Sequence, residues 1–277
     1  MGLRINTNVA SLSAQRAISS TNETQARSYE RLASGNRITR AGDDAAGLSI
    51  SENLRAQIRS LGQAERNAND GISAIQVAEG GTNEIANIIV RLRELSVQAA
   101  SDTVGDTERG FINQEFRSLI GEVDRIANVT TFNGTPLLSG ENGKESLQFQ
   151  VGIRNNDADR IEFNVQENDV RSEAIGIQEL DPTTIETARE ALDTIDIGMA
   201  KVSEVRARLG AMQNKMQSTS NNLGLAKENY SAARSRIADT DVAQETSALV
   251  RDNILQQSGV AVLAQANKHP TLALQLL

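Results

Sequence analysis

Residues 183 to 237 decide the fold, and they read TTIETAREALDTIDIGMAKVSEVRARLGAMQNKMQSTSNNLGLAKENYSAARSRI, with no proline. Asp181-Pro182-Thr183 at their start is typical of a helix beginning, because proline fits the first helical turn. Counted in sevens, one stripe of this segment is apolar throughout: Ala188, Ile195, Val202, Leu209, Met216, Leu223, Tyr230 and Ile237. Such a stripe predicts a long, coiled-coil-like helix that packs along other helices.

The length of this helix indicates the architecture. At 1.5 Å per residue it would span about 80 Å, whereas a compact globule of this chain's size would be only about 50 Å across. The helix does not fit into such a globule. The sequence therefore predicts a mainly α protein in the form of a helical rod.

The first 135 residues also lack proline and repeat the helical pattern in shorter pieces. Apolar residues recur at three- and four-residue spacing over 58–75 and again, in a shifted frame, over 85–99. We interpret the Gly80-Gly81 pair between these pieces as a stutter or weak point within one helix, not as its end. Asp106-Thr107 predicts the cap of a further helix with its apolar face over 112–126.

Between the helical blocks the period of the pattern changes from helical to alternating. Apolar and polar residues alternate over 147–153 and over 161–165, and Asn155-Asn156-Asp157 between them is typical of a turn. Asn133-Gly134 is a turn signal ahead of this region. The pattern predicts a β-hairpin near residues 145–166.

The composition excludes most catalytic chemistry. The chain has no Cys, one His (His269) and only seven aromatic residues, so a Cys nucleophile and a Cys/His zinc site are excluded. Composition alone leaves open an enzyme that uses only carboxylates. We expect a protein without catalytic residues, cofactor or metal, whose interior consists of aliphatic helix seams.

Two classes of partner are also disfavoured. The pI is near 4.9 and no basic stripe is interleaved with aromatics, so nucleic acid is not expected as a partner. No run of ~20 apolar residues could span a bilayer, and no secretory signal pattern stands at the N-terminus. We expect no membrane insertion and, if the chain is exported, a route without a cleaved signal peptide.

The two ends of the chain differ from its middle. Residues 1–43 hold few large aliphatics between polar runs, so we expect them to fold only against a partner. From residue 239 onward, apolar residues recur at helical intervals and end in a leucine-rich tail over 272–277, which predicts self-association. The residues selected as candidates for polymerisation contacts are Val9, Leu12, Ile18, Leu249, Ile254, Val260 and Leu263.

The charge distribution separates the same regions. Residues 1–56 carry a formal charge of +2 and residues 235–277 carry −1. Because the net charge of the whole chain is −8, residues 57–234 carry −9. Nearly neutral ends can pack together at a crowded centre, whereas an acidic middle suits a solvated surface.

Motifs at both ends resemble one family. The segments RLASGNRI at 31–38 and GDDAAGL at 42–48 resemble the amino-terminal region of bacterial flagellins, as does INTN at 5–8. The carboxy-terminal region of flagellins is similar to LGAMQN at 209–214 and SAARSRIADTD at 231–241, and further to ILQQSG at 254–259 and VLAQAN at 262–267. The resemblance covers residues 1–177 and 183–277.

This resemblance implies a structural subunit that self-assembles into the bacterial flagellar filament for motility. Residues 1–56 and 235–277 would form an inner domain of paired terminal helices that line the central channel. Residues 57–177 and 183–234 would form the rod with its hairpin. The short connector at 178–182 would replace the variable outer domains of other flagellins, which predicts a thin, smooth filament.

The resemblance also implies location and partners. The chain would be exported unfolded through the flagellar channel and polymerised outside the cell as part of the flagellum. Its partners would be further copies of itself, an export chaperone, and the cap and hook-associated proteins.

Residues 90–98, VRLRELSVQ, form a second candidate contact segment. Arg91, Leu95 and Gln98 are spaced to share one helix face, which favours a subunit contact with Leu95 in a seam. The segment is also similar to the one that Toll-like receptor 5 recognises in many flagellins, and Glu115 on the neighbouring helix would be a further contact. Val90 departs from that pattern, because recognised members commonly have Gln there.

Three alternatives differ from a filament subunit. A flagellin-like hook-filament junction protein would share the terminal helices and is the nearest of them. A flagellin carrying a hydrolase is set aside, because the connector is too short and a single histidine cannot form a His-Glu-x-x-His site. A coiled-coil binding module or secreted effector would form a rod that does not polymerise.

Overall fold

The computed structural model describes residues 7–140 and 146–274, with side chains up to residue 268. The start of the INTN motif, the end of the leucine-rich tail and the side chain of His269 lie outside the described residues. The chain forms two compact units, unit 1 from residues 1–58 and 228–277 and unit 2 from residues 59–227.

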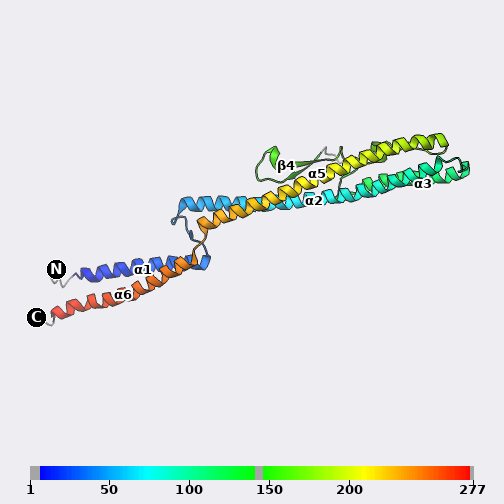
Figure 1. The fold of residues 1–277 in the computed structure, drawn as a ribbon. Helices are drawn as coiled ribbons and strands as arrows, with labels where there is room; N and C mark the ends of the chain where they lie inside the picture. Colours follow the sequence, from blue (N-terminus) through cyan, green and yellow to red (C-terminus); the bar gives the residue numbers. More distant parts are fainter. Residues whose placement is uncertain (1–6, 141–145, 275–277) are drawn as a thin grey trace. The chain divides into compact units, whose positions relative to one another are not determined.

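Long helices account for most of both units (Figure 1). Unit 1 holds α1 (Val9–Ser34), the start of α2 (Ala45–Ala99), the end of α5 (Ile185–Ala238) and α6 (Val242–Leu274). Unit 2 holds the remainder of α2 and α5 together with α3 (Asp106–Val129) and the short α4 (Ser172–Ile175). The mainly α fold predicted from the heptad stripe is confirmed, and α5 covers the predicted segment almost to the residue.

Two small antiparallel hairpins complete unit 2. The β1 strand (Thr131–Phe132) pairs with β2 (Thr135–Pro136) across Asn133-Gly134. The β3 strand (Ser146–Gln150) pairs with β4 (Arg160–Asn164), with a 3₁₀ turn at Asp157–Asp159 between them. The predicted hairpin near residues 145–166 is therefore confirmed, and the turn signal at Asn133-Gly134 forms a hairpin of its own.

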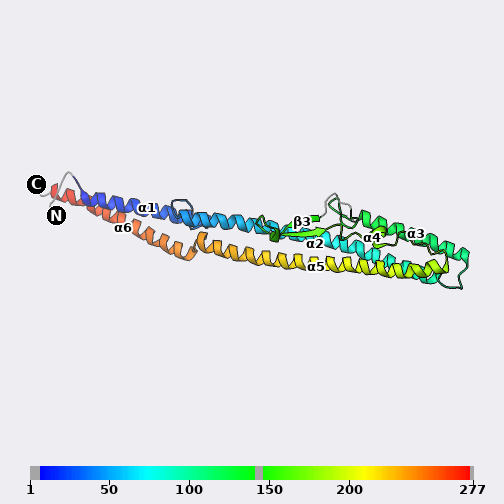
Figure 2. The same ribbon diagram turned by 90° about the horizontal axis from the view of Figure 1, so that it is seen from above.

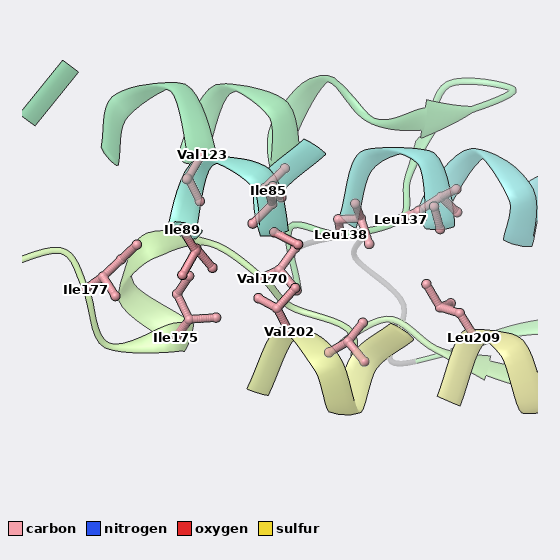
Figure 3. Packing of buried hydrophobic residues seen from close by; sticks show 14 of the residues in the cluster. Ile85, Ile89, Val123, Leu137, Leu138, Val170, Ile175, Ile177, Val202 and Leu209 are labelled. Carbon is pink, nitrogen blue, oxygen red and sulfur yellow. The ribbon is translucent and has the colours of Figure 1, made fainter. Parts of the chain in front are cut away.

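The predicted apolar stripe of α5 runs along the buried core of unit 2. Its positions at 188, 195, 202, 209, 216 and 223 are all buried, whereas Tyr230 is exposed and Ile237 is half-buried. Figure 3 shows Val202 of α5 and Ile85 of α2 on either side of Val170, with Leu209 of α5 further along towards Leu137, all within one apolar cluster. The buried seam thus ends at Leu223, earlier than the sequence pattern, because the last two stripe positions belong to unit 1.

Helix α2 passes through Gly80-Gly81 without a break, as predicted. The structure gives Gly81 a packing role in place of the expected weak point. A Cβ at residue 81 would lie 2.7 Å from Thr130 Oγ1 and 2.9 Å from Leu138 Cδ1. Glycine therefore allows the segment after α3 to approach α2 closely.

A buried arginine joins α2 to α3. Arg109 is only 5% exposed, and its Nε donates to the carbonyl of Ala99 at 2.9 Å. Its Nη2 donates to the carbonyl of Ser101 at 3.1 Å, and Nη1 pairs with Asp106 at 2.8 Å. The guanidinium thus satisfies carbonyl groups at and beyond the end of α2, where helical partners are missing.

Two phenylalanines on α3 provide a matched test of the core. Phe116 is fully buried, whereas Phe111 is 65% exposed. Phe116→Ala should lower the free energy of unfolding by about 3–5 kcal/mol because it leaves a cavity. Phe111→Ala should change it by less than about 0.5 kcal/mol. Thermal or denaturant unfolding followed by circular dichroism measures both, and equal losses would contradict the described core.

Candidate functional site

The two terminal helices form an antiparallel pair in unit 1 (Figures 1 and 2). Asn8 caps α1 by accepting from the backbone N–H of Ser11 and also donates to the carbonyl of Ala266 at 2.9 Å. Further along, Gln25 donates to Asn253 at 2.6 Å. Arg31 and Glu245 lie 3.8 Å apart at the other end of α1. Polar contacts therefore run along most of the pair.

Small and polar side chains make up most of the seam between these helices. Residues at alternating three- and four-residue intervals are buried or half-buried on both helices, which is the spacing of a coiled-coil seam. On α1 these residues are Ser11, Ala14, Ile18, Thr21, Gln25, Ser28 and Leu32. On α6 they are Glu245, Leu249, Asp252, Gln256, Gly259, Leu263 and Ala266.

Large apolar side chains point outward from the same pair. The aliphatic ones on α1 and α6 that are between 49% and 60% exposed are Val9, Leu12, Val242, Val250, Ile254, Leu255, Val260 and Val262. In the described part of unit 1, the buried apolar residues are only Ile38, Ala238 and Ala266. The unit therefore displays more large apolar side chains than it buries, and such a surface marks an interaction site.

The candidates for polymerisation contacts fall into two groups. Val9, Leu12, Ile254 and Val260 are exposed and are available to another molecule. The other three, Ile18, Leu249 and Leu263, are half-buried in the seam between α1 and α6. Those three side chains hold the pair together instead of lying on its outer surface.

The family motifs from opposite ends of the chain meet where α1 and α5 end. Gly35 ends α1 in the left-handed conformation, with φ of 70°, and its carbonyl accepts from the N–H of Thr240 at 2.9 Å. The N–H of Arg37 donates to the carbonyl of Ala238 at 2.7 Å, and its guanidinium donates to the carbonyl of Ile237. We refer to these contacts between 35–37 and 237–240 as the junction.

Asp43 and Asp44 stabilise the turn that leads into α2. The Asp43 carboxylate accepts from the N–H groups of Arg40 and Thr39 and from the Thr39 hydroxyl. These bonds, the one from Arg40 foremost, lower the pKa of Asp43. Asp44 accepts from the N–H of Gly47 in the first turn of α2 at 2.8 Å. The pair thus serves as a turn and a helix cap.

The second candidate segment divides between surface and core. Arg91 and Glu115 are exposed and paired, with Arg91 Nη2 2.8 Å from Glu115 Oε1, and this bond raises the pKa of Arg91. Gln98 is also exposed, but Leu95 is only 1% exposed and belongs to the unit 2 core. The expected common face of Arg91, Leu95 and Gln98 is therefore not a surface. Leu95 lies on the apolar stripe over 85–99, and this pattern in the sequence could have predicted that Leu95 is buried.

Arg93 forms a matching link from α2 to α5. Its Nε lies 2.8 Å from Asp196 Oδ1, and both side chains are about half exposed. The hydrogen bond from Arg93 lowers the pKa of Asp196. Two arginines separated by one residue thus connect α2 to two different helices, and sequence periodicity predicted neither pair.

Within 7–140 and 146–274, none of the helices has the length and hydropathy needed to cross a membrane. Among the side chains the structure describes there, no group of three or more His, Cys, Asp or Glu is arranged to hold a metal ion. The exposed apolar side chains make the outward faces of α1 and α6 the main candidate site. Long helices combined with such terminal faces define a structural protein of the helical, self-associating class.

Comparison with known proteins identifies the family. Residues 5–143 match the bacterial flagellin N-terminal helical region, and residues 192–277 match the C-terminal helical region. The chain is 44% identical over 273 residues to a flagellin of Halalkalibacterium halodurans, with 99% of each chain covered. It is 42% identical over 307 residues to a flagellin of Bacillus subtilis, with 99% of this chain and 100% of that one covered. The chain belongs to the bacterial flagellin family and is a structural subunit of the flagellar filament.

Solved structures agree on the fold. A crystal structure of Bacillus cereus flagellin has a TM-score of 0.51 at 24% identity and covers 57% of this chain and 88% of that one. A putative flagellar hook-associated protein from Vibrio parahaemolyticus has a TM-score of 0.58 at 14% identity and covers 71% and 100%. At these identities the likeness supports the fold alone.

The Arg93–Asp196 pair predicts a specific response to pH. The Asp196 carboxyl should titrate below its ordinary value of 3.8, because Arg93 stabilises the charged form. Its contribution to stability is present above the unfolded pKa and is lost as the pH falls through the folded pKa. In Arg93→Gln the pKa should return towards 3.8. Carboxyl titration by NMR measures this shift, and an unchanged Asp196 pKa in the variant would contradict the pairing.

Proposed function

We propose that the chain polymerises through the outward apolar faces of α1 and α6. The observation that supports this proposal is that the two helices pair mostly through small and polar side chains and leave large apolar side chains exposed. Burying a half-exposed Val, Leu or Ile contributes roughly 1 kcal/mol. Several such residues on each subunit, repeated along a polymer, would stabilise the assembly considerably.

The weak seam between α1 and α6 explains why the ends of the chain would order only during assembly. Because few large apolar residues lie between α1 and α6, the pair gains little on folding alone to offset the entropy of ordering two helices. At a growing tip, neighbouring subunits would cover the outward faces at the same moment. The ends would therefore order on joining the filament, and free subunits would stay apart.

The geometry of a filament follows from head-to-tail contact. An interface that joins two different patches, and whose rotation does not close, generates an open helical polymer. We assign residues 1–56 and 235–277 to the inner domain and residues 57–177 and 183–234 to the rod. The division of the chain near residues 58 and 228 supports this assignment.

The connector at 178–182 takes the place of outer domains in this proposal. It is anchored to unit 2, because Asp181 pairs with Arg117 of α3 at 2.9 Å and Leu180 packs against the core. A connector held in this way adds no further domain between α4 and α5. We therefore infer a thin, smooth filament.

The proposal includes further partners and a location outside the cell. Unfolded export through the flagellar channel is consistent with the absence of Cys, since disulfides would obstruct a narrow passage. An export chaperone would cover the apolar ends before assembly, and cap and hook-associated proteins would contact them in the finished structure. We infer no enzymatic activity, which agrees with the structural role of the family.

Recognition by host Toll-like receptor 5 is a second proposed role. The exposed group formed by Arg91, Gln98 and Glu115 supports it, and Leu95 would act by supporting α2 from the core. The Arg91–Glu115 and Arg91–Glu94 pairs present this group as a mixed-charge surface.

Assembly through the apolar faces predicts the effect of a small set of variants. Ile254→Asn combined with Val260→Asn should reduce sedimentable polymer at least tenfold, because a polar amide cannot fill an apolar contact. Ile254→Val keeps the apolar character and should assemble normally. Electron microscopy and sedimentation after salt or seed addition measure polymer, while circular dichroism checks that the rod remains folded.

Removal of residues 235–277 should also abolish polymerisation and leave unit 2 folded. A truncated chain that still forms filaments would refute the proposed division. Persistent monomer of the unaltered chain under all seeding conditions would instead favour the hook-filament junction protein.

Receptor recognition has a closely matched control on the same helix. Arg91→Ala and Glu115→Ala should each lower receptor-reporter activation by purified monomer about tenfold. Arg93→Ala removes an arginine of nearly equal exposure, 49% against 48%, and should leave activation unchanged. Equal activation by Arg91→Ala and the unaltered protein would sink this role. Leu95→Ala is a poor probe, because it leaves a cavity in the core.

A further inference from the structure

A short ladder of side-chain amides crosses the middle of the α1–α6 pair. Gln25 Nε2 donates to Asn253 Oδ1 at 2.6 Å, and Gln256 Nε2 donates to Asn22 Oδ1 at 2.9 Å. The two bonds lie one helical turn apart. Each helix therefore contributes two amides whose partners stand on the opposite helix, and we refer to these four residues as the amide ladder.

We infer that the amide ladder fixes the register in which α1 pairs with α6. Large apolar side chains are few in this seam, so most of its packing specifies the register weakly. In coiled coils, a polar residue at a seam position selects one alignment, since other alignments leave it without a partner. In the ladder, Gln25 and Gln256 stand at such seam positions, whereas Asn253 is half-buried beside the seam and Asn22 is exposed at its edge.

Alignments in which α6 is shifted along α1 by one heptad would break the hydrogen bonds of the amide ladder. A shift of one heptad in one direction would place Gln25 opposite Val260 and Asn22 opposite Leu263. The opposite shift would place Gln25 opposite Thr246 and Asn22 opposite Leu249. Three of these four encounters set an amide against an apolar side chain. The cost in free energy falls mainly on half-buried Gln25, which would lose its hydrogen bond, because the exposed Asn22 can bond to water.

A steric contact favours the same register. Gly259 of α6 faces Ile18 of α1 so closely that a Cβ at residue 259 would lie 2.9 Å from Ile18 Cγ1. A shift of one heptad would bring Ala266 or Asp252 to this place, and both residues carry a Cβ. The glycine and the ladder therefore select one alignment by independent means.

The register matters because it positions the outward apolar faces relative to each other. A one-heptad slip moves the apolar residues of α6 by about 10 Å along α1. The two halves of the surface would then no longer match a neighbouring subunit. This inference rests on the proposed assembly through these faces and names the residues that align them.

Engineered disulfides can measure the register directly, because the chain has no Cys. Ile18→Cys with Gly259→Cys reports the described alignment, since the two Cβ atoms would lie within bridging distance. Ile18→Cys with Ala266→Cys, and Ile18→Cys with Asp252→Cys, report the two slips. Full-length protein is oxidised, and the intrachain product is measured on a non-reducing gel for the sedimented and the soluble fractions separately.

The ladder is then removed in each reporter by Gln25→Leu with Gln256→Leu. Loss of two hydrogen bonds should raise the ratio of slipped to described crosslink about tenfold. The matched control is Gln15→Leu with Gln257→Leu, two exposed glutamines of the same helices outside the ladder, and it should leave the ratio within about twofold.

Two results would overturn the inference. One is an equal ratio in the ladder variant and the control. The other is slipped reporters that crosslink as readily as the described pair in the otherwise unaltered chain. Sedimentation of the reduced proteins tests assembly separately, so filaments with an unchanged ratio would reject the register role and leave the assembly proposal standing.

Discussion

The packing of the α5 stripe against α2 is the contact on which unit 2 depends. Residues such as Ile195, Val202 and Leu209 on α5 and Ile85 and Ile89 on α2 are completely or almost completely buried. Helix α3, the hairpins and the segment from Val170 to Ile177 add their apolar side chains to this seam. Aliphatic residues at regular spacing make up most of this interior, and a few phenylalanines such as Phe116 and Phe163 complete it, so a chain with few aromatic residues can form it.

The two units divide the apolar residues of the chain differently. In unit 2 the large aliphatics face each other across the helices, and polar pairs such as Arg93–Asp196 lie at the surface. In unit 1 the arrangement is reversed, because amides and small residues face each other and Ile254 and Val260 face outward. Unit 2 therefore has the composition of a self-sufficient fold, whereas unit 1 has the composition of one layer in a larger structure.

Periodicity predicted the elements well because it is a local property of the sequence. It predicted the position of α5 and of the β3–β4 hairpin, and it was consistent with one helix α2 that continues through Gly80-Gly81. It also placed Leu95 on an apolar stripe, although the motif that contains Leu95 suggested a surface. Contacts between residues far apart in the chain leave no such trace. The burial of Arg109 and the amide ladder depend on which helices meet, so only the three-dimensional arrangement shows them.

The junction joins residues that lie about 200 positions apart, as the bonds of Arg37 to Ile237 illustrate. A ribosome delivers the chain from its N-terminus, so Arg37 emerges long before its partner exists. Every contact between α1 and α6 must wait even longer, until nearly the whole chain has been made. Unit 1 therefore cannot form before nearly the whole chain has been made, and throughout synthesis its first helix is without its partner. This late closure gives other proteins a window in which the amino-terminal segment can be bound while it is unpaired.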